Sequence, residues 1–485
     1  MLIRRSRYSR TIALLAIASA GSVALAACSS SSSPGASGGA TGSSSSPVTI
    51  TVAVTANPLM TTIEQLTPGG FEASHPGIKV KFVTYDENTE REDVEKDVAT
   101  GAGQYDVVMI GPNDIASWAK NNWIVNLNSY TAADPSYDVG DLLPPIRTAL
   151  SSNSDASYDV SDILPPIRTA LSSNGKLYAV PFYAESSFMM YNKQMFAAAH
   201  VTMPANPTWA QIATLAAQLN QPSKGVAGIC LRGLTGWGDN LASLDTVINT
   251  FGGSWFNDKW DAELTSPADE QAVSFYVNLV KKDGEKGAGN DSFDQCLSIM
   301  EQKKAAMWYD ATVAASTLDA PGSPIDGDLG FAPAPVDKTK SSGWLWSWAL
   351  ALEGASKNKS AAWQFMSWAT SKQYIAYDAS KNGWAAVPPG TRTSTYHNSS
   401  YLKAAGAFAP LTLQEIDSVN VVQPGLNPQP VPGIQYVGIP EFEEFGQQVS
   451  AQITAAIDGQ ESVATALSKS QAIAQQAVIQ AGYKK

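Results

Sequence analysis

The chain has 485 residues, of which 44% are hydrophobic and only 16% charged, and its formal net charge is −12. This length and composition predict a globular protein of two lobes or domains rather than one with a single core. The negative charge, without a basic cluster to meet phosphates, argues against nucleic acid as a partner.

The first 27 residues have the three parts of a secretion signal. Arginines come first, residues 12–25 are apolar, and small residues precede Cys28. The pattern resembles the signal peptides of bacterial lipoproteins, in which the cysteine carries lipid and becomes the N-terminus. The alternative is a transmembrane anchor, but the apolar stretch is shorter than the ~20 residues that a span needs. We therefore expect a signal peptide over 1–27 and an exported chain, anchored by lipidated Cys28 at the outer face of the cytoplasmic membrane.

A Ser/Gly-rich segment follows the cysteine and cannot bury a core, so residues 28–47 are expected to form a lipidated tether. The folded body then begins at Val48 with alternating β-branched and apolar residues. Strand and helix patterns alternate from there, which predicts a parallel α/β sheet. The expected elements are a strand at 48–54, a helix at 60–74, a strand at 78–83, a helix at 90–101 and a strand at 105–110.

A tandem duplication interrupts this pattern. Residues 136–154 recur at 157–175 with three differences in nineteen positions, within units of 136–156 and 157–177. Two copies do not make a solenoid, because stacked repeats normally need at least three. We interpret the pair as a recent duplication that one lobe tolerates at its surface. The second copy runs directly into Gly175–Pro181, so we expect it to keep the original packing and the first copy to be the extra one.

The α/β pattern resumes near residue 181, with a strand at 186–191. Gly/Pro-rich stretches at 319–335 and 424–440 are typical of connections between lobes or of loops around a cleft. Helices are expected at 207–220, 239–250, 267–282, 441–457 and 461–480.

Besides Cys28 the chain has two cysteines, Cys230 and Cys296. In an oxidising compartment two cysteines can form a disulfide, which we favour over a pair of buried free thiols. The three histidines are scattered without ligand spacing, so neither a metal site nor a cofactor is expected.

No common catalytic or nucleotide-binding motif occurs in the sequence. The residues that say most about function are therefore the tryptophans near isolated carboxylates. Trp344, Trp346 and Trp348 alternate, so they would share one face of a strand. Such a face is either a core wall or a ligand platform, and aromatic rings suit the C–H faces of sugars and polyols.

Charged residues also stand in apolar surroundings. Glu185, Arg232 and Asp310 would form either structural ion pairs or part of a ligand site, and Asp239 is either a helix N-cap or a further ligand group. Carboxylates accept hydrogen bonds from hydroxyls, and arginine donates in a planar fork. Together with the indoles, these groups indicate a site for a polyhydroxyl ligand.

Nine segments that follow one another along the chain carry a family pattern. They are Gln104–Gly111, Trp118–Trp123, Pro181–Ser187, Gly228–Gly233, Gly236–Asn240, Asn249–Gly253, Met307–Ala315, Trp344–Ala351 and Gly383–Arg392. With the lipoprotein signal and the tether, they resemble the family 1 extracellular solute-binding proteins of ABC importers, which have the maltose-binding-protein fold. The similarity is greatest to the sorbitol/mannitol-binding branch, and the duplication departs from the family pattern.

The resemblance implies an α/β fold of the two-lobe periplasmic-binding-protein type (type II). Each lobe would be a parallel-type sheet flanked by helices, with the ligand cleft between the lobes. Lobe 1 would comprise residues 48–182 and 340–388, and lobe 2 residues 183–339 and 389–485.

The implied function is capture of a sugar alcohol such as sorbitol, mannitol or arabitol, or of a small sugar, and its delivery to the permease subunits of an ABC importer. Lobe closure around the ligand would give a form that docks on the permease. The resemblance implies a monomer without catalysis, which contacts the membrane through its lipid alone. The ligand-binding residues would be Asn57, Asn88, Glu185, Arg232, Trp237, Asp239, Asp310, Trp344 and Trp346.

Three alternatives stay open at this point. One is an oligosaccharide-binding protein of the same family, and another is a purely structural surface lipoprotein. The third is a secreted glycoside hydrolase that uses Glu185 and Asp310, because such enzymes need only two carboxylates across a cleft. Glu185→Gln would abolish turnover in a hydrolase but only weaken affinity in a binding protein.

Overall fold

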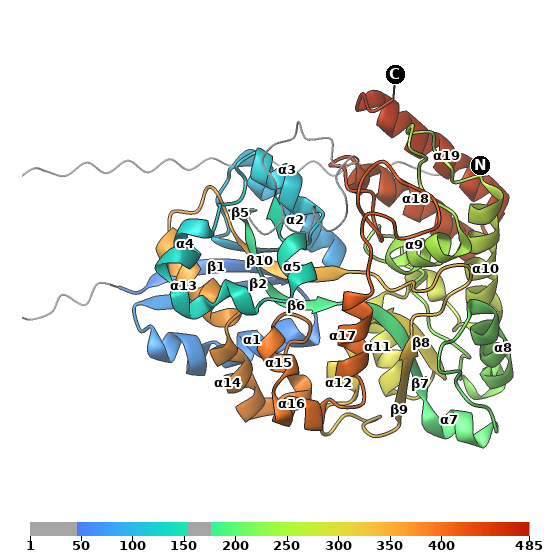
Figure 1. The fold of residues 1–485 in the computed structure, drawn as a ribbon, viewed down its shortest axis with the longest axis horizontal. Coiled ribbons are helices and arrows are strands. Elements are labelled where there is room, and N and C mark those ends of the chain that lie inside the picture. The colour runs from blue at the N-terminus through green and yellow to red at the C-terminus, as the bar shows by residue number, and fades with distance from the viewer. Residues whose placement is uncertain (1–45, 153–175, 485) are drawn as a thin grey trace, which may run out of the picture. The chain divides into compact units, whose positions relative to one another are not determined.

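Two β-sheets, linked by an almost uninterrupted pair of strands, organise the computed structural model, which describes residues 46–152 and 176–484 (Figure 1). The chain from Ser46 onward forms one compact unit. The expected signal peptide over 1–27 and lipid-carrying Cys28 lie outside the described residues. None of the helices that the structure describes has both the length and the hydrophobicity needed to cross a membrane.

The first sheet has five strands in the order β2-β1-β3-β10-β6, and we call the part of the protein built on it lobe 1. β1, β2 and β3 run parallel, as expected, whereas β10 runs antiparallel to both β3 and β6. Parallel strands need crossover connections, which α1 supplies between β1 and β2, and α2 between β2 and β3, the strand on the other side of β1. The strands are β1 (Val48–Thr55), β2 (Ile78–Tyr85), β3 (Val107–Ile110), β6 (Ala179–Glu185) and β10 (Trp346–Leu352).

Helices cover lobe 1, and most of them are short. Around this sheet Figure 1 shows α1 (Pro58–Leu66), α2 (Glu87–Thr100), α3 (Asp114–Lys120), α4 (Asn128–Ala133), α5 (Pro144–Ala149), α13 (Lys359–Ala369), α14 (Lys372–Asn382), α15 (Thr393–Tyr396) and α16 (Ser399–Ala404). A separate two-stranded ladder joins β4 (Ser151–Ser152) to β5 (Lys176–Leu177).

The second sheet, on which lobe 2 is built, corrects the expectation of parallel strands. β7 (Ser187–Asn192) lies between β8 (Met307–Ala311) and β9 (Leu329–Pro333) and is antiparallel to both. The reason is the chain path. Only Ser186 separates β6 from β7, so β7 continues into lobe 2, while β8 and β9 run back toward the lobe boundary.

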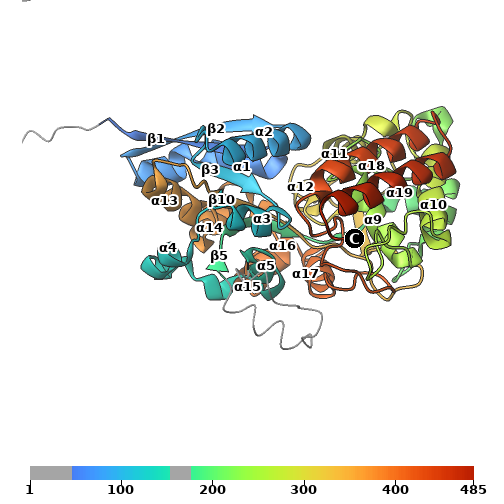
Figure 2. The ribbon, with the colours of Figure 1, turned by 90° about the horizontal axis from the view of Figure 1, so that it is seen from above.

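Lobe 2 carries the longest helices. Every residue of α9 is buried, including its polar ones such as Asp245 and Thr246. α18 and α19 lie side by side in both ribbon views (Figure 2). The helices are α7 (Lys193–Ala198), α8 (Trp209–Leu219), α9 (Asn240–Phe251), α10 (Pro267–Asp283), α11 (Phe293–Glu301), α12 (Ala314–Leu318), α17 (Ala409–Asp417), α18 (Phe442–Ile457) and α19 (Val463–Gln480).

The first copy of the duplication packs into lobe 1, which corrects the expectation that it is the extra copy. Its apolar side chains Leu142, Ile146 and Leu150 are at most 1% exposed. The buried guanidinium of Arg392 donates to the carbonyl oxygens of Tyr137 and Asp138, at 2.9 and 3.2 Å. These core contacts belong to the first copy, whereas the second copy, 157–175, lies outside the described residues.

The segment after η7 (Trp384–Ala386) also contacts lobe 1, although the sequence placed residues from 389 onward in lobe 2. Pro389 accepts a backbone hydrogen bond from Ala184, and Thr391 accepts one from Leu143. The lobe boundaries stay a prediction.

The other short helical turns are η1 (Pro68–Glu72), η2 (Pro135–Tyr137), η3 (Val139–Asp141), η5 (Pro222–Lys224) and η6 (Ala288–Asn290).

Candidate functional site

A cavity of about 160 Å³ lies between the two sheets, with walls from both lobes. Lobe 1 supplies loops at the carboxyl ends of β1, β2 and β6, the edge at which open α/β sheets bind ligands. Lobe 2 supplies the loop before α9, the start of α11 and the end of β8. The polar side chains at the wall include Asn57, Glu87, Asn88, Tyr183, Glu185, Arg232, Asp239 and Asp294.

Asn57 is fixed by the turn from β1 into α1. Its Oδ1 accepts from the backbone N–H of Met60 at 3.0 Å, which caps α1. Its Nδ2 donates to Thr55 Oγ1 and to the Tyr183 hydroxyl, both at 3.2 Å. The side chain is therefore held at the cavity by groups at the ends of two strands.

Glu185 is the last residue of β6 and is only 5% exposed. Burial raises the pKa of its carboxyl well above the usual value, and the charge of Arg232 opposes that rise. The indole N–H of Trp344 faces the carboxyl and lowers its pKa. No hydrogen bond of normal geometry joins the two, however, because the Trp344 nitrogen has no partner among the described residues.

Arg232 and Asp310 form a buried bidentate ion pair. Arg232 Nε donates to Asp310 Oδ2 at 2.9 Å, and Nη2 donates to Oδ1 at 2.6 Å. Arg232 Nη1 donates to the Gly238 carbonyl at 2.9 Å, and Trp308 Nε1 donates to Asp310 at 3.0 Å. Asp310 is fully buried and is absent from the cavity wall, so in this structure it orients Arg232.

Asn88 and Asp239 join the lobes across the cavity. Asn88 Nδ2 donates to Asp239 Oδ2 at 3.0 Å and to the Thr235 carbonyl at 3.2 Å. Asp239 does not cap α9 with its side chain, so the N-cap interpretation does not explain it. Burial, with the nearby charge of Glu87, raises the pKa of Asp239 to about 7. The lobes approach closely here, since a side chain at Gly238 would collide with Glu87.

A second contact between the lobes lies at the other side of α2. The Asn113 amide donates to Asp114 on α3 at 2.8 Å and to Glu443 on α18 at 2.7 Å. Burial raises the pKa of Asp114 to about 6, and that of Glu443 well above its usual value. The raised pKa values favour the protonated forms of these two neighbouring carboxyls.

The tryptophan face is partly covered by the protein itself. Trp346 and Trp348 pack edge to face at 5.6 Å, and Trp237 of lobe 2 meets Trp346 at 5.9 Å. The Arg91 guanidinium lies 4.1 Å from the Trp237 ring centre and 4.7 Å from that of Trp348. Trp344 precedes β10. A cavity of about 30 Å³ borders all four indoles together with Glu185 and Arg232.

Several wall residues were not expected from the sequence, among them Glu87, Arg91, Tyr183 and Asp294. Glu87 and Arg91 form an i,i+4 ion pair at 2.8 Å on α2. The available signal was Asp86, whose side chain caps α2 and so starts the helix at Glu87 rather than near residue 90. The position of Asp294 at the start of α11 had no comparable signal.

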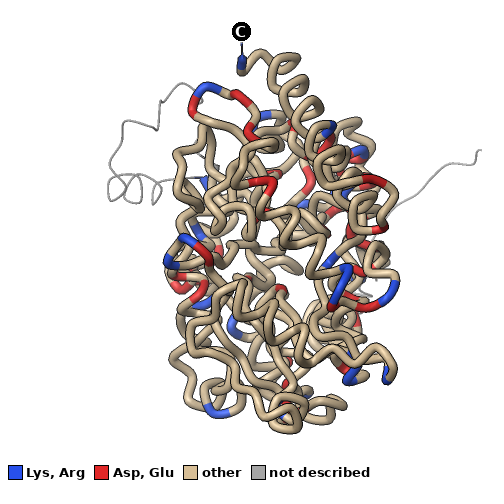
Figure 3. Tube along the Cα trace, turned by 90° about the vertical axis from the view of Figure 1, so that its right-hand side faces the viewer, with Lys and Arg blue, Asp and Glu red and all other residues tan. Residues whose placement is uncertain are grey.

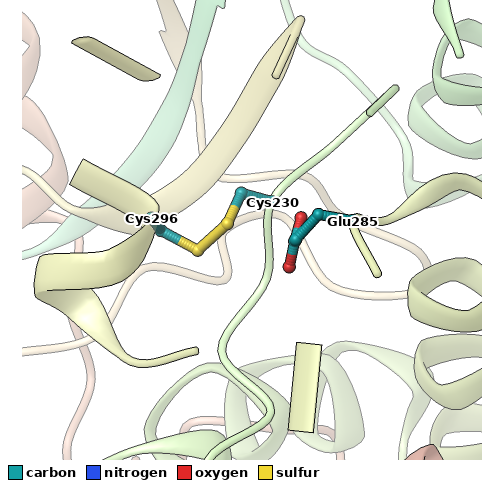
Figure 4. Close-up of side chains that lie close together, drawn as sticks. All are labelled: Cys230, Glu285 and Cys296. Atoms are coloured by element: carbon teal, nitrogen blue, oxygen red, sulfur yellow. A yellow bond between two sulfur atoms is a disulfide. The ribbon is translucent and has the colours of Figure 1, made fainter. Parts of the chain in front are cut away.

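The disulfide between Cys230 and Cys296 stands behind this wall, with a Cα–Cα distance of 5.7 Å (Figure 4). Glu285 lies beside it, and these three residues are the group within the described ranges that has the spacing of metal ligands. Because the two sulfurs bond to each other, they offer no thiolate to a metal. Burial and the neighbouring Asp291 raise the pKa of Glu285 to about 9, which disfavours the anionic carboxylate form in which Glu285 would bind a metal ion.

The sequence is similar to known proteins over most of its length. Residues 55–376 match the family described as bacterial extracellular solute-binding protein. The mannitol-binding protein of Pseudomonas aeruginosa is 40% identical over 439 residues, which cover 90% of this chain and 94% of that protein.

Two solved structures of ABC transporter solute-binding proteins share the fold. The protein of Agrobacterium vitis S4, with bound D-mannitol, is 43% identical with a TM-score of 0.84, over 90% of this chain and 100% of that one. The protein of Agrobacterium radiobacter K84, in complex with ribitol, is 22% identical with a TM-score of 0.75, over 89% and 99%. The α/β fold of the periplasmic-binding-protein type, expected from the sequence, is confirmed.

Proposed function

This chain belongs to the bacterial extracellular solute-binding proteins, a non-catalytic family, and we propose that it captures linear sugar alcohols for an ABC importer. D-mannitol is the first ligand to test. The family assignment leaves the glycoside hydrolase interpretation of Glu185 and Asp310 without support.

One observation carries the proposal. The cavity wall joins carboxylates, amides, a phenol and a guanidinium from both lobes, and alditol hydroxyls can both donate to and accept from such groups. A ligand that lacks one hydroxyl would leave a buried partner unpaired, at a cost of about 1–3 kcal/mol. Discrimination by chain length and stereochemistry would follow from these costs.

The relatives support the same ligand class. The Pseudomonas aeruginosa protein is a mannitol-binding protein, and the Agrobacterium vitis structure holds D-mannitol. Both are at least 40% identical to this chain over about nine-tenths of it. An oligosaccharide ligand remains the second candidate, because maltose-bound and acarbose-bound proteins share the fold at lower identity.

We assign the binding roles as follows. Asn57, Asn88, Glu185, Arg232 and Asp239 would hydrogen-bond the ligand from the wall. Asp310 would orient Arg232, and the indoles of Trp237, Trp344 and Trp346 would close the side of the cavity. A ligand that touches both lobes stabilises the closed form, which is the state that would deliver it to the permease.

Cys28 would anchor the exported protein by lipid, after removal of residues 1–27. The sequence pattern before Cys28 supports this step. Labelled palmitate should enter the wild-type protein in cells and be absent from Cys28→Ala, and equal labelling of the two would contradict the anchor.

Ligand-induced stabilisation tests the function. Thermal unfolding of the protein should shift upward with mannitol, sorbitol or arabitol, because ligand at about 100 times its dissociation constant adds about 2.7 kcal/mol. Maltose and cellobiose serve as comparison ligands. A shift with these oligosaccharides alone would overturn the polyol assignment, and no shift with any of them would overturn both.

Site variants make the test specific. Glu185→Gln should weaken mannitol binding, whereas Glu64→Gln, on the exposed face of α1, should leave it unchanged. Equal affinity of the Glu185→Gln and wild-type proteins would contradict the role of Glu185.

A further inference from the structure

Acidic and basic residues are interspersed along the described chain (Figure 3), whereas the cavity has an excess of acids. The guanidinium of Arg232 at its wall and that of Arg91 beside it are already paired with carboxylates of the protein. Arg232 donates hydrogen bonds from Nε and Nη2 to Asp310 and from Nη1 to the Gly238 carbonyl. Arg91, which borders the adjoining small cavity, donates Nε and Nη2 to Glu87 at 3.3 and 2.8 Å.

Four further carboxyls at the wall have no ion pair with any cation of residues 46–152 and 176–484. They are Glu185 and Asp239, which are 5% and 3% exposed, Asp86, whose side chain caps α2, and Asp294 at the rim. A ligand carboxylate or phosphate would meet these groups while both guanidiniums are occupied. A ligand cation would instead supply the missing positive charge.

A buried hydrogen-bond donor that could serve a ligand lies beside Glu185. Trp344 is 1% exposed, its indole N–H has no hydrogen-bond partner among the described residues, and it borders the small cavity beside Glu185. Buried polar groups of native proteins almost always have partners. A ligand hydroxyl beside Glu185 could accept from this N–H while the charged end of the ligand meets the carboxyl.

We propose that the cleft also takes alditols in which a protonated amine replaces a terminal hydroxyl, and that it rejects alditol derivatives bearing a carboxylate or phosphate. This inference rests on the proposed function, because it uses the same cavity. An ammonium group donates three hydrogen bonds, and its bonds to carboxylates are roughly twice as strong as those between neutral groups.

Proton release gives an independent readout. Burial raises the pKa of Glu185, with Arg232 opposing and Asp310 and Glu87 adding to the rise, and it raises the pKa of Asp239 to about 7. A bound ammonium favours the ionised carboxyls, so protons should leave the protein when the amine binds. A primary amine stays protonated from about pH 6 to about pH 8, and its affinity should increase over that range.

Calorimetric titration of the protein with three ligands of identical stereochemistry tests the proposal. The ligands are D-mannitol, 1-amino-1-deoxy-D-mannitol and D-mannonate, at low ionic strength and in two buffers of different ionisation enthalpy. We expect the amine to bind at least as tightly as mannitol with net proton release, and mannonate to bind at least about tenfold more weakly than mannitol. An amine that binds more weakly than mannitol, or mannonate within tenfold of mannitol, would overturn the inference.

Failure of the proposed function has a different signature. Absence of binding by all three ligands would remove both proposals, whereas mannitol binding with a weak amine would remove only this one. Amine binding without mannitol binding would keep the cation site and remove the polyol function.

Variants of the wall carboxyls test which of them contributes to binding of the amine. Glu185→Gln should lower the ratio of amine to mannitol affinity about tenfold, and Glu64→Gln should leave the ratio unchanged. Thermal unfolding shows whether the Glu185→Gln protein is folded, and Asp239→Asn provides a second variant if it is not. An unchanged ratio in a folded variant of either wall carboxyl would contradict the role given to that carboxyl.

Discussion

Removal of residues 154–174 should leave the fold intact and increase its stability. In the structure Ser151 pairs with Leu177 and Ser152 with Lys176, and the 23 residues 153–175 connect the two strands. The deletion joins Asn153 to Gly175, which makes a two-residue Asn-Gly loop, the favoured sequence for a type I′ hairpin. All contacts of the first copy described above remain.

The expected gain follows from loop length. Shortening the connection from 23 to two residues is about 3.5 halvings, and each contributes about 0.6 kcal/mol of closure entropy, so the gain is about 2 kcal/mol. Urea unfolding followed by tryptophan fluorescence measures it, and mannitol titration checks the site. A lower unfolding midpoint or loss of mannitol binding would refute the inference that the first copy carries the packing.

A matched deletion tests the packing more finely. Removing 136–156 gives a chain of the same length that differs only by serine for Gly140 and isoleucine for Leu142. Because Leu142 is buried, the isoleucine should cost less than about 1.5 kcal/mol relative to the first deletion. A larger loss would show that this core position does not tolerate the second copy's sequence.

Three further predictions concern buried charge and the disulfide. Asp310→Asn should lower the free energy of unfolding by about 3–5 kcal/mol and weaken mannitol binding, because it leaves the buried charge of Arg232 uncompensated; a loss below 1 kcal/mol in urea unfolding would contradict this. Burial raises the folded-state pKa of Asp114 from 3.8 to about 6, so the folded form binds more protons than the unfolded form, and stability should fall as pH rises from about 4 to about 6. The Asp114→Asn protein should show a shallower fall, and an unchanged slope would refute the assignment. Replacing Cys230 and Cys296 by serine should cost about 4 kcal/mol, since the bond closes a span of 66 residues, and an unchanged urea midpoint would count against it.

Local patterns predicted the elements well where one residue type dominates. The expected strand at 48–54 is found at Val48–Thr55, and the helix expected at 267–282 is found at Pro267–Asp283. β-branched alternation defines the first, and a serine cap followed by proline defines the start of the second. Strand direction was less accessible, because the sense of β7 follows from its continuation of β6 rather than from its own composition.

Part of the cavity wall could be expected from the sequence. Five of the nine expected residues line the larger cavity, since polar residues at strand ends indicate that edge of the sheet. The position of Arg91 against Trp237 was not accessible, because it joins residues of different lobes that are far apart in sequence. For Asp310 the sequence left an ion pair and a ligand site open, and the structure shows the ion pair with Arg232.

The disulfide links oxidation to readiness for binding. Cys230 lies two residues before Arg232, and Cys296 lies two residues after Asp294, so the bond fastens together two segments of the lobe 2 wall. The disulfide orders these two segments before the ligand arrives, so ligand binding does not have to supply the free energy of ordering them. Disulfides form in oxidising compartments and are rare in the reducing cytosol. We therefore expect newly made protein to bind polyols weakly until export, which would keep it from sequestering the solute inside the cell that imports it.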